Sequence, residues 1–326
     1  MTSKNIFEAM EEDINSSKID EQTKKKLFQN LFNLKQQKVN LMITGATGCG
    51  KSSTINAMFN TEVAKVGIGV DPETMDIQKY ELDNLILWDS PGLGDGKEKD
   101  IQHSKGIIKK LNELDEKGNP LIDLILVILD GGSRDLGTSY ELINQVIIPN
   151  IGDNAKDRVL IAINQADVAM KGRYWDYENN KPEPKLIEFL EGKVKSVKGR
   201  VKEATRVDVD PIYYSAGYKD GDEEQKPWNL SKLLYFIVKN TPSEKRLSYV
   251  NNISDKKEMW EDDDELIDYK EEVQKSFLET VKEYASEGAD IGGEIGSLFG
   301  KTGKAIGRTV GGVVGAVWGG IKSIFS

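Results

Sequence analysis

The sequence contains very little of what proteins with disulfides, with histidine-ligated metals or with membrane-spanning helices need. It has one cysteine, Cys49, so no intramolecular disulfide can form, and one histidine, His103, so no histidine cluster can hold a metal. No stretch reaches the roughly 18 uncharged apolar residues of a spanning helix. No apolar run follows Met1 either, so we expect no secretory signal and a reducing, cytoplasmic compartment.

The charge and the composition exclude two further classes of protein. Lys plus Arg number 44 against 54 for Asp plus Glu, a net charge of −10, which disfavours a nucleic-acid-coating protein. Hydrophobic residues make up 38%, enough to bury a core, so the chain as a whole is not disordered. A length of 326 residues allows two domains, or one large domain with appendages.

Apolar runs and helical patterns alternate along most of the chain. Leu27, Leu31 and Leu34 recur at helical spacing, so residues 1–37 are expected to form a leading helix. The runs predicted to be buried strands are 39–43, 85–88, 121–129, 159–163 and 212–214. Helical patterns occupy 52–59, 101–114, 140–146, 186–203 and 230–239. We therefore predict an α/β domain over residues 38–242, with a mostly parallel sheet flanked by helices.

Two segments of different composition follow this domain. Residues 243–287 are expected to be an acidic helical linker, in which the run 261–265 is interpreted as a solvated stretch. Residues 288–326 form a tail that holds 12 of the 31 glycines of the chain.

A phosphate-binding loop follows the first predicted strand. The segment from Gly45 to Ser52 fits the pattern G-x-x-x-x-G-K-[ST] between a strand and a helix. Its glycines let backbone amides point at phosphates, and the helix N-terminus adds partial positive charge. We expect the nucleotide to bind to Gly45, Ala46, Thr47, Gly48, Cys49, Gly50, Lys51, Ser52 and Ser53. Lys51 would reach the β and γ phosphates, and Ser52 would ligate Mg²⁺.

Two predicted strands end in an aspartate that could lie near the metal, Asp89 and Asp130. Asp89 begins the pattern D-x-x-G that ends at Gly92, in which the acid lies near the metal and the glycine amide approaches the γ phosphate. Asp130 lacks this arrangement. Asp89 is therefore the predicted metal-site acid, acting through water.

With these motifs the sequence resembles the Ras-like GTPase superfamily, and within it the bacterial Era-like group. Asn164-Gln165-Ala166-Asp167 follows a predicted strand and matches the family's N-K-x-D motif. The resemblance implies that Asp167 accepts hydrogen bonds from guanine and that Asn164 braces the loops. It also implies that Ser215 and Ala216 contact the base, and that Thr74 meets Mg²⁺ and the γ phosphate. Lys51, Thr74 and Gly92 are then the catalytic residues, and Ser52, Thr74 and Asp89 hold the metal.

The sequence departs from the family's pattern at two positions. Gln165 replaces the lysine whose stem packs on the base. Leu93 follows Gly92 where well-known members carry the glutamine that orients the attacking water. We therefore expect slow hydrolysis unless another group, a partner or a second copy of this chain orients the water.

Three further residues have both a functional and a plain interpretation. Arg134 could offset phosphate charge in cis or across a dimer, or could pair locally with Asp135. His103 is interpreted as a surface histidine. Cys49 could block the loop when oxidised, or could simply be a small residue that fits there.

The tail has the pattern of a glycine zipper. Glycines recur at every fourth position from Gly288 to Gly300 and again from Gly303 to Gly319, which on a helix allows close approach of another helix. From Ile291 onward the tail carries four basic residues and one acidic residue, a net charge of +3. Contact with an anionic membrane surface, self-association as a homo-oligomer, and packing on the chain's own domain remain open.

The function predicted from these patterns is a switch protein that hydrolyses GTP to GDP and phosphate. The alternative is a nucleotide-dependent assembly protein, in which GTP is a structural ligand and turnover is incidental. A third hypothesis, an ATPase or kinase, is disfavoured by Asp167.

Overall fold

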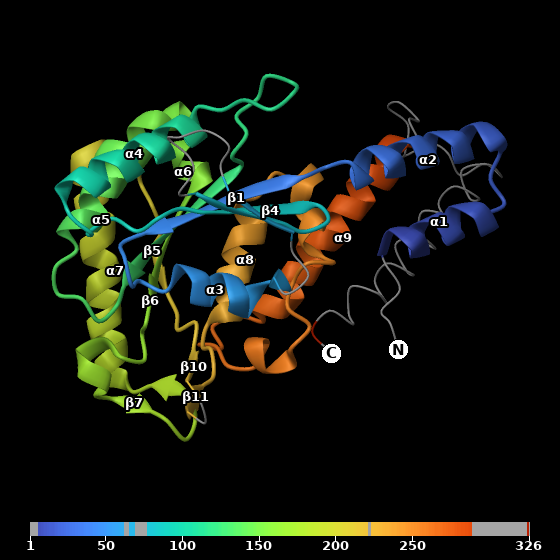
Figure 1. Ribbon diagram of the computed structural model, residues 1–326. Helices are drawn as coiled ribbons and strands as arrows, with labels where there is room; N and C mark the ends of the chain where they lie inside the picture. Colours follow the sequence, from blue (N-terminus) through green and yellow to red (C-terminus); the bar gives the residue numbers. More distant parts are fainter. Residues whose placement is uncertain (1–5, 62–64, 69–76, 221–222, 289–324, 326) are drawn as a thin grey trace.

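The computed structural model describes residues 6–61, 65–68, 77–220, 223–288 and 325 (Figure 1). Thr74 and the tail from residue 289 onward, apart from Phe325, lie outside the described residues. The expectations for them therefore stay predictions.

The centre of the molecule is a sheet of seven strands in the described residues, in the order β2-β3-β4-β1-β5-β6-β9. Five of them are parallel: β1 (Val39–Gly45), β4 (Leu85–Asp89), β5 (Leu124–Asp130), β6 (Val159–Asn164) and β9 (Ile212–Tyr213). The other two lie at one edge: β3 (Gln78–Glu81) pairs antiparallel with β4, and the edge strand β2 (Lys65–Ile68) pairs antiparallel with β3. The predicted mostly parallel sheet is confirmed.

Helices connect the strands and cover the sheet. The described α-helices are α1 (Ile6–Ser16), α2 (Glu21–Lys35), α3 (Lys51–Met58), α4 (Lys97–Leu111), α5 (Gly137–Glu141), α6 (Ala155–Arg158), α7 (Pro184–Thr205), α8 (Leu230–Asn240) and α9 (Tyr269–Gly288). A π-helix (Leu142–Ile147) continues α5, and short 3-10 turns include Ser243–Tyr249 and Lys257–Trp260. Two small hairpins, β7 (Trp175–Asp176) with β8 (Lys181–Pro182) and β10 (Tyr218–Asp220) with β11 (Glu223–Gln225), lie beside the sheet.

The central strands are buried on both faces, which explains their unbroken apolar runs. In β5, Leu124, Leu126 and Ile128 contribute to one hydrophobic core, while the alternate residues Ile125 and Val127 contribute to the other. Successive side chains of a strand point to opposite faces, so a strand covered on both sides must be apolar at every position. Helices α4, α5 and α7 cover one face, and α1, α2, α3, α8 and α9 cover the other.

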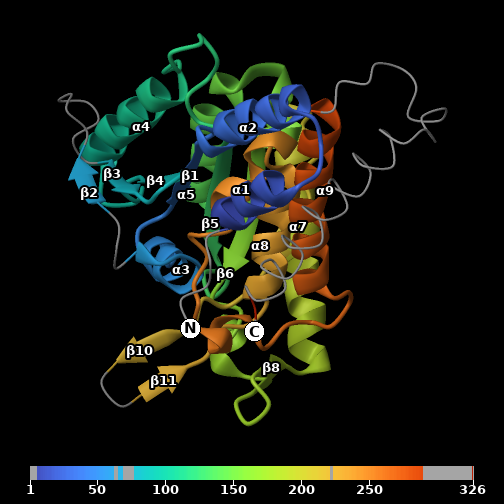
Figure 2. The ribbon, with the colours of Figure 1, turned by 90° about the vertical axis from the view of Figure 1, so that its right-hand side faces the viewer.

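The N-terminal and C-terminal helices belong to the same core as the sheet. Leu31 of α2 and Phe277 of α9 are buried together with Leu41 of β1. Figure 2 shows α1 and α2 beside α9, at the end of the sheet where β1 begins. The expected boundaries at residues 38 and 243 are therefore crossed by one continuous hydrophobic core.

The leading segment is two helices, where we expected one. The first ends at Ser16 and the second starts at Glu21, with Asp20 as its N-cap. The Asp20 carboxylate accepts hydrogen bonds from the Thr23 amide at 2.9 Å and from the Thr23 hydroxyl at 2.7 Å. This side-chain cap satisfies amides of the first turn and fixes a new helix start inside the polar stretch.

The interpretation of residues 261–265 as a solvated stretch is wrong. The carboxylate of Asp264 lies 2.6 Å from the Lys232 ammonium and 2.8 Å from the Tyr269 hydroxyl. Asp263 accepts a hydrogen bond from the Ser231 hydroxyl at 2.7 Å, and Asp262 accepts one from the Asn180 amide at 2.7 Å. These acids follow Trp260, whose ring is buried. The run therefore binds the N-terminal end of α8 instead of extending into solvent.

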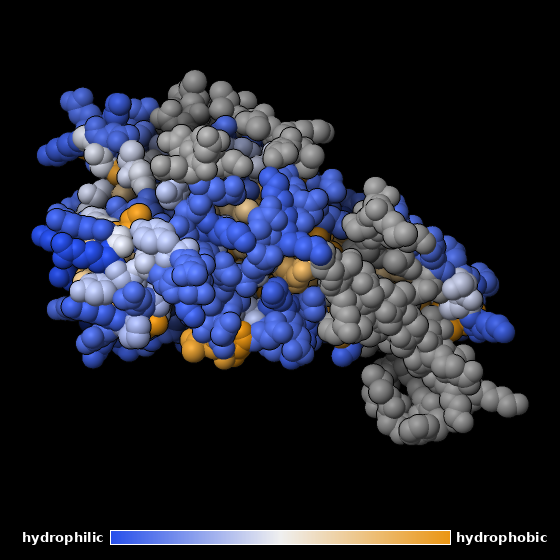
Figure 3. All heavy atoms as spheres, turned by 90° about the horizontal axis from the view of Figure 1, so that it is seen from below, coloured by the Kyte–Doolittle hydropathy of each residue, from blue (hydrophilic) through white to orange (hydrophobic). Residues whose placement is uncertain are grey.

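Among the described residues, no helix is long and apolar enough to cross a membrane. The face seen from below in Figure 3 is mainly hydrophilic where it is described, and its apolar residues form small separate groups. Phe325, the single described residue of the tail, packs its ring edge against Trp260 with a centroid distance of 5.8 Å.

The shared core predicts that α9 contributes strongly to stability. We expect Phe277→Ala to lower the free energy of unfolding by about 3–5 kcal/mol, because it leaves a cavity among α2, α8 and α9. Leu266→Ala, at a side chain that is 72% exposed, is the control and should stay within about 0.5 kcal/mol of the parent. Urea unfolding followed by circular dichroism measures both, and equal effects would contradict the shared core.

Candidate phosphate-binding and base-binding site

The phosphate loop connects the buried strand β1 to helix α3. Gly50 has a left-handed φ of +89°, and a Cβ there would lie 2.2 Å from the Asn164 Nδ2. A Cβ at Gly45 would lie 2.3 Å from the carbonyl oxygen of Ile128. No side chain caps the N-terminus of α3, so its first amides are available to an anion.

The ammonium of Lys51 lies over this loop. Its Nζ donates to the carbonyl oxygen of Ala46 at 3.1 Å, and the carbonyl oxygen of Gly45 is 3.5 Å away. The positive charge therefore stands within the loop, where a bound phosphate would meet it.

Two of the three residues predicted to hold Mg²⁺, Ser52 and Asp89, lie next to each other beside the loop. The Ser52 hydroxyl donates to Asp89 Oδ2 at 3.3 Å, and Asp89 Oδ1 is buried without a hydrogen-bond partner in the described residues. Burial raises the pKa of Asp89, while the charge of Lys51 and the Ser52 bond lower it in part. A hydroxyl and a carboxylate whose second oxygen has no partner among the described residues are oxygen donors of the kind that a hard cation such as Mg²⁺ prefers.

Asp130, the other aspartate considered for the metal site, uses its carboxylate for hydrogen bonds within its own turn. Its Oδ1 accepts hydrogen bonds from the amides of Gly132 at 2.7 Å and Ser133 at 3.2 Å. The carboxylate therefore closes its own turn. Arg134 on the same loop is exposed.

The segment that contains Gly92 packs directly on the phosphate loop. The Thr47 amide donates to the Leu93 carbonyl at 3.0 Å, and the Leu93 amide donates to the Gly45 carbonyl at 3.4 Å. A Cβ at Gly92 would lie 2.5 Å from the Thr47 nitrogen, so only glycine fits. The Leu93 side chain is buried in the core that α4 covers.

His103 is not the simple surface histidine that we expected. Its ring is half-buried on α4, and Nδ1 donates to the Gly92 carbonyl at 3.1 Å. The neighbouring Asp100 accepts a hydrogen bond from the Gly94 amide at 2.8 Å. Helix α4 thus holds the Gly92 segment from outside the phosphate loop. One sequence signal could have indicated these contacts: Asp100 and His103 both lie in the first two turns of the helix that follows the D-x-x-G pattern.

Asn164, the last residue of β6, joins loops that are far apart in the sequence. Its Nδ2 donates to the Cys49 carbonyl at 2.9 Å, and its Oδ1 accepts from the Ala216 amide at 2.9 Å. Gln165 makes a second link to the phosphate loop, from Nε2 to the Gly48 carbonyl at 2.9 Å.

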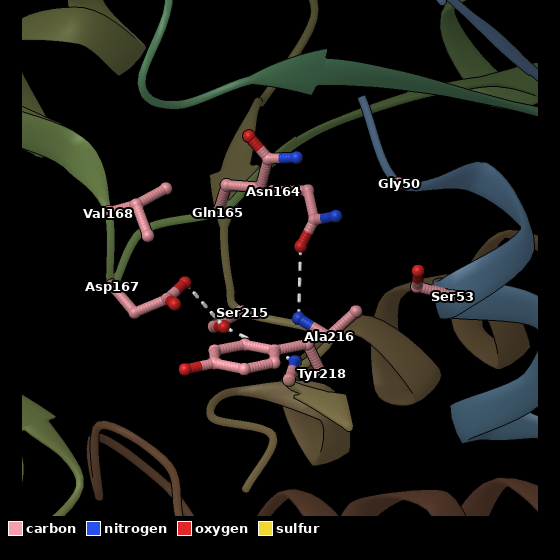
Figure 4. Close-up of a pocket in the computed structure, with 10 residues that line it drawn as sticks. Gly50, Ser53, Asn164, Gln165, Asp167, Val168, Ser215, Ala216 and Tyr218 are labelled. Atoms are coloured by element: carbon pink, nitrogen blue, oxygen red, sulfur yellow. Dashed lines mark hydrogen bonds between the residues drawn. The ribbon is translucent and has the colours of Figure 1, made fainter. Parts of the chain in front are cut away.

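A cavity of about 240 Å³ opens beside these loops (Figure 4). The Asp167 carboxylate accepts a hydrogen bond from the Ser215 hydroxyl at 2.6 Å, and the two side chains point toward each other in Figure 4. The lining residues are Gly50, Ser53, Asn164, Gln165, Asp167, Val168, Ser215, Ala216, Gly217 and Tyr218. The motif residues Gly50, Asn164, Asp167, Ser215 and Ala216 are therefore brought together around one cavity.

Sequence reasoning missed three of the lining residues, Val168, Gly217 and Tyr218. Val168 follows Asp167 directly, and Gly217 and Tyr218 follow Ser215-Ala216, so their proximity to both motifs was the available signal. Gly217 has a left-handed φ of +70°, which turns the chain into β10.

Comparison with known proteins agrees with this geometry. Residues 40–165 match the family described as 50S ribosome-binding GTPase, a stretch that includes the phosphate loop and ends at Gln165. The chain is 29% identical over 148 residues to the uncharacterized protein YfjP and 28% identical to the uncharacterized protein YkfA, both of Escherichia coli strain K12. Each alignment covers 44% of this chain and 47% of the relative, so the match spans about half the length of these curated relatives.

Among solved structures, Toc33 from Arabidopsis thaliana in complex with GDP and Mg²⁺ aligns with 74% of this chain and 98% of its own. The sequence identity is 16% and the TM-score is 0.41. A likeness at this level says nothing about function.

The burial of Cys49 predicts an unreactive thiol. Desolvation raises its pKa from about 9 to about 11, although the charge of Lys51 opposes the shift. Between these two pH values the unfolded thiol has lost its proton while the folded thiol keeps it. The free energy of unfolding therefore falls as the pH rises from about 9 to about 11.

We expect the native protein to react very slowly with DTNB at pH 8 and the urea-unfolded protein to react rapidly. Cys49→Ala gives the baseline, since no other thiol is present. Rapid labelling of the native protein would contradict the burial of this side chain.

Proposed function

We propose that this chain binds GTP and hydrolyses it to GDP and phosphate. The observation that carries the proposal is the cavity in which Asp167 and Asn164 face the end of the phosphate loop at Gly50. A phosphate loop alone would suit many nucleotides, whereas an adjoining cavity with a buried carboxylate suits a base that offers hydrogen-bond donors. Guanine offers them at its N1 and N2 positions.

The residues of the phosphate loop then have separate roles. Backbone amides from Gly45 to Ser53 bind the phosphates, and Lys51 neutralises charge on the β and γ phosphates. Ser52, together with Asp89 through water, would hold Mg²⁺. When bound, Mg²⁺ offsets the negative charge that develops on the transferred phosphate. Thr74 is proposed as a further ligand from the family resemblance.

Gly92 is proposed to sense the γ phosphate through its amide. Its close contact with Thr47 supports this role, because a glycine is required where two backbone segments meet beside the phosphates. Ser215 and Ala216 are proposed to contact the base, since both line the cavity next to Asp167.

Slow turnover is proposed for the isolated chain. The Leu93 side chain is apolar and buried, so it offers no group that could orient an attacking water. A partner or a second copy of the chain would have to supply that group, and Arg134 is an exposed cation on a loop near the site. The buried, apolar Leu93 side chain also favours the second candidate function, a nucleotide-dependent assembly protein in which nucleotide binding matters more than turnover.

The tail is proposed to act as an association segment. Its glycine stripe and net charge of +3 suit self-association or contact with an anionic membrane surface from the cytoplasm. The contact of Phe325 with Trp260 supports the third possibility, packing on the chain's own domain. We propose no nucleic-acid partner, and within the GTPase superfamily we propose the Era-like group.

Guanine selectivity provides the main test. Asp167→Ala should weaken GTP binding by at least about a hundredfold, because two hydrogen bonds to a charged carboxylate are lost. ATP binding should not change, and Asp135→Ala, at an exposed acid outside the cavity, should bind GTP like the parent. Displacement of a fluorescent guanine nucleotide by GTP and by ATP measures these affinities. Equal affinity of the parent for GTP and ATP would contradict the proposal.

Deletion of residues 288–326 tests the tail. We expect the deletion to abolish binding to anionic liposomes in flotation and concentration-dependent light scattering in the presence of a nonhydrolysable GTP analogue. GTP binding should persist, because the residues proposed to bind the phosphates and the base all precede residue 288. Unchanged flotation and scattering would contradict an association role.

A further inference from the structure

The base cavity lacks the side chain that would be expected to pack on a planar base. Gln165 occupies the position of the family's lysine stem, but its amide is engaged with the Gly48 carbonyl at 2.9 Å. Its backbone has a left-handed φ of 62°. Gln165 therefore connects two loops, and another side chain must cover the base.

Tyr218 is the one aromatic residue among the described residues that line the cavity. The residue is 52% exposed, although a tyrosine ring is largely apolar. In Figure 4 the ring lies across the cavity, between the side chain of Asp167 and Ala216. A half-exposed ring next to a carboxylate and a free cavity has the position of a stacking platform.

The backbone around Tyr218 holds the ring in place. A Cβ at Gly217 would lie 2.3 Å from the Gln225 carbonyl oxygen, so the chain turns tightly before β10. In the hairpin Tyr218 pairs with Gln225, whose side chain donates to Asn180. Asn180 in turn donates to the Pro227 carbonyl at 3.0 Å. The hairpin is therefore fixed to the body of the protein at the end that carries Tyr218.

We propose that Tyr218 stacks on the nucleobase and so takes the place of the missing lysine stem. This inference rests on the proposed nucleotide binding at the same cavity. Asp167 and Ala216 would recognise the edge of the base, and the Tyr218 ring would cover its face. Stacking involves the π-face that every base has, so Tyr218 contributes affinity while Asp167 contributes selectivity.

The test measures equilibrium binding of GDP and ADP to the full chain and to Tyr218→Ala. We expect Tyr218→Ala to weaken GDP binding roughly tenfold, within the range found when a stacking aromatic is removed. Tyr218→Phe keeps the ring and should bind GDP like the parent. Phe32→Ala is the matched control, since Phe32 is a 57% exposed aromatic residue on α2, outside the cavity.

A second probe separates stacking from a general structural defect. Tripolyphosphate with Mg²⁺ has no base, so its affinity should be the same for Tyr218→Ala and the parent. Loss of tripolyphosphate binding together with GDP binding would overturn the proposal, as would a Tyr218→Ala variant that binds GDP like the parent.

The same measurements distinguish this inference from the proposed function. If the parent binds ADP as tightly as GDP, guanine selectivity is wrong, yet a tenfold loss of ADP affinity in Tyr218→Ala would still support stacking. If the parent binds neither nucleotide, both proposals are overturned.

Discussion

The carboxamide of Asn164 is the contact on which the arrangement of the site depends. Asn164 lies at the end of a central strand. Its Nδ2 donates a hydrogen bond to the Cys49 carbonyl, and its Oδ1 accepts one from the Ala216 amide. A carboxylate could not donate the first bond, and an apolar side chain would leave both backbone groups unpaired in a buried place. Gly50 has to be a glycine because the Asn164 amide occupies the space of a Cβ. The phosphate loop and the loop that carries Ser215 and Ala216, the base loop, are thereby linked through one side chain.

A second set of hydrogen bonds joins the base loop to the C-terminal part of the chain. Ser215 exchanges backbone hydrogen bonds with Trp228, and the next residue, Asn229, donates its amide to the Asp262 carbonyl at 2.8 Å. The Asn229 side chain also accepts a hydrogen bond from the Asp264 amide at 2.8 Å. Since α9 begins only a few residues later, the base loop and this helix are parts of one connected structure. The acidic run is kept in place by these bonds despite its negative charge.

The segment after Asp89 combines a close backbone contact with an apolar side chain. Gly92 and Leu93 lie against the phosphate loop, with Leu93 in the core and the His103 ring on the Gly92 carbonyl. A polar side chain at residue 93 would have to give up this packing to reach the phosphates. The apolar residue thus stabilises the segment, and its side chain offers no polar group on the phosphate-loop side.

The sequence by itself determined the local features of this protein. Strands buried on both faces must be apolar throughout, so β1, β4, β5 and β6 could be predicted from short runs, and the phosphate loop from eight consecutive residues. The tertiary structure alone decided which distant segments meet. Strand β3, which lies between the edge strand β2 and β4, is only partly buried and carries no apolar run, and the contacts of His103, Phe277 and Tyr218 depend on strand order and helix packing. Neighbouring motifs indicate at most that such a residue lies near the site, because the same residue types are common where no contact forms; strand order and helix packing decide which group each residue meets.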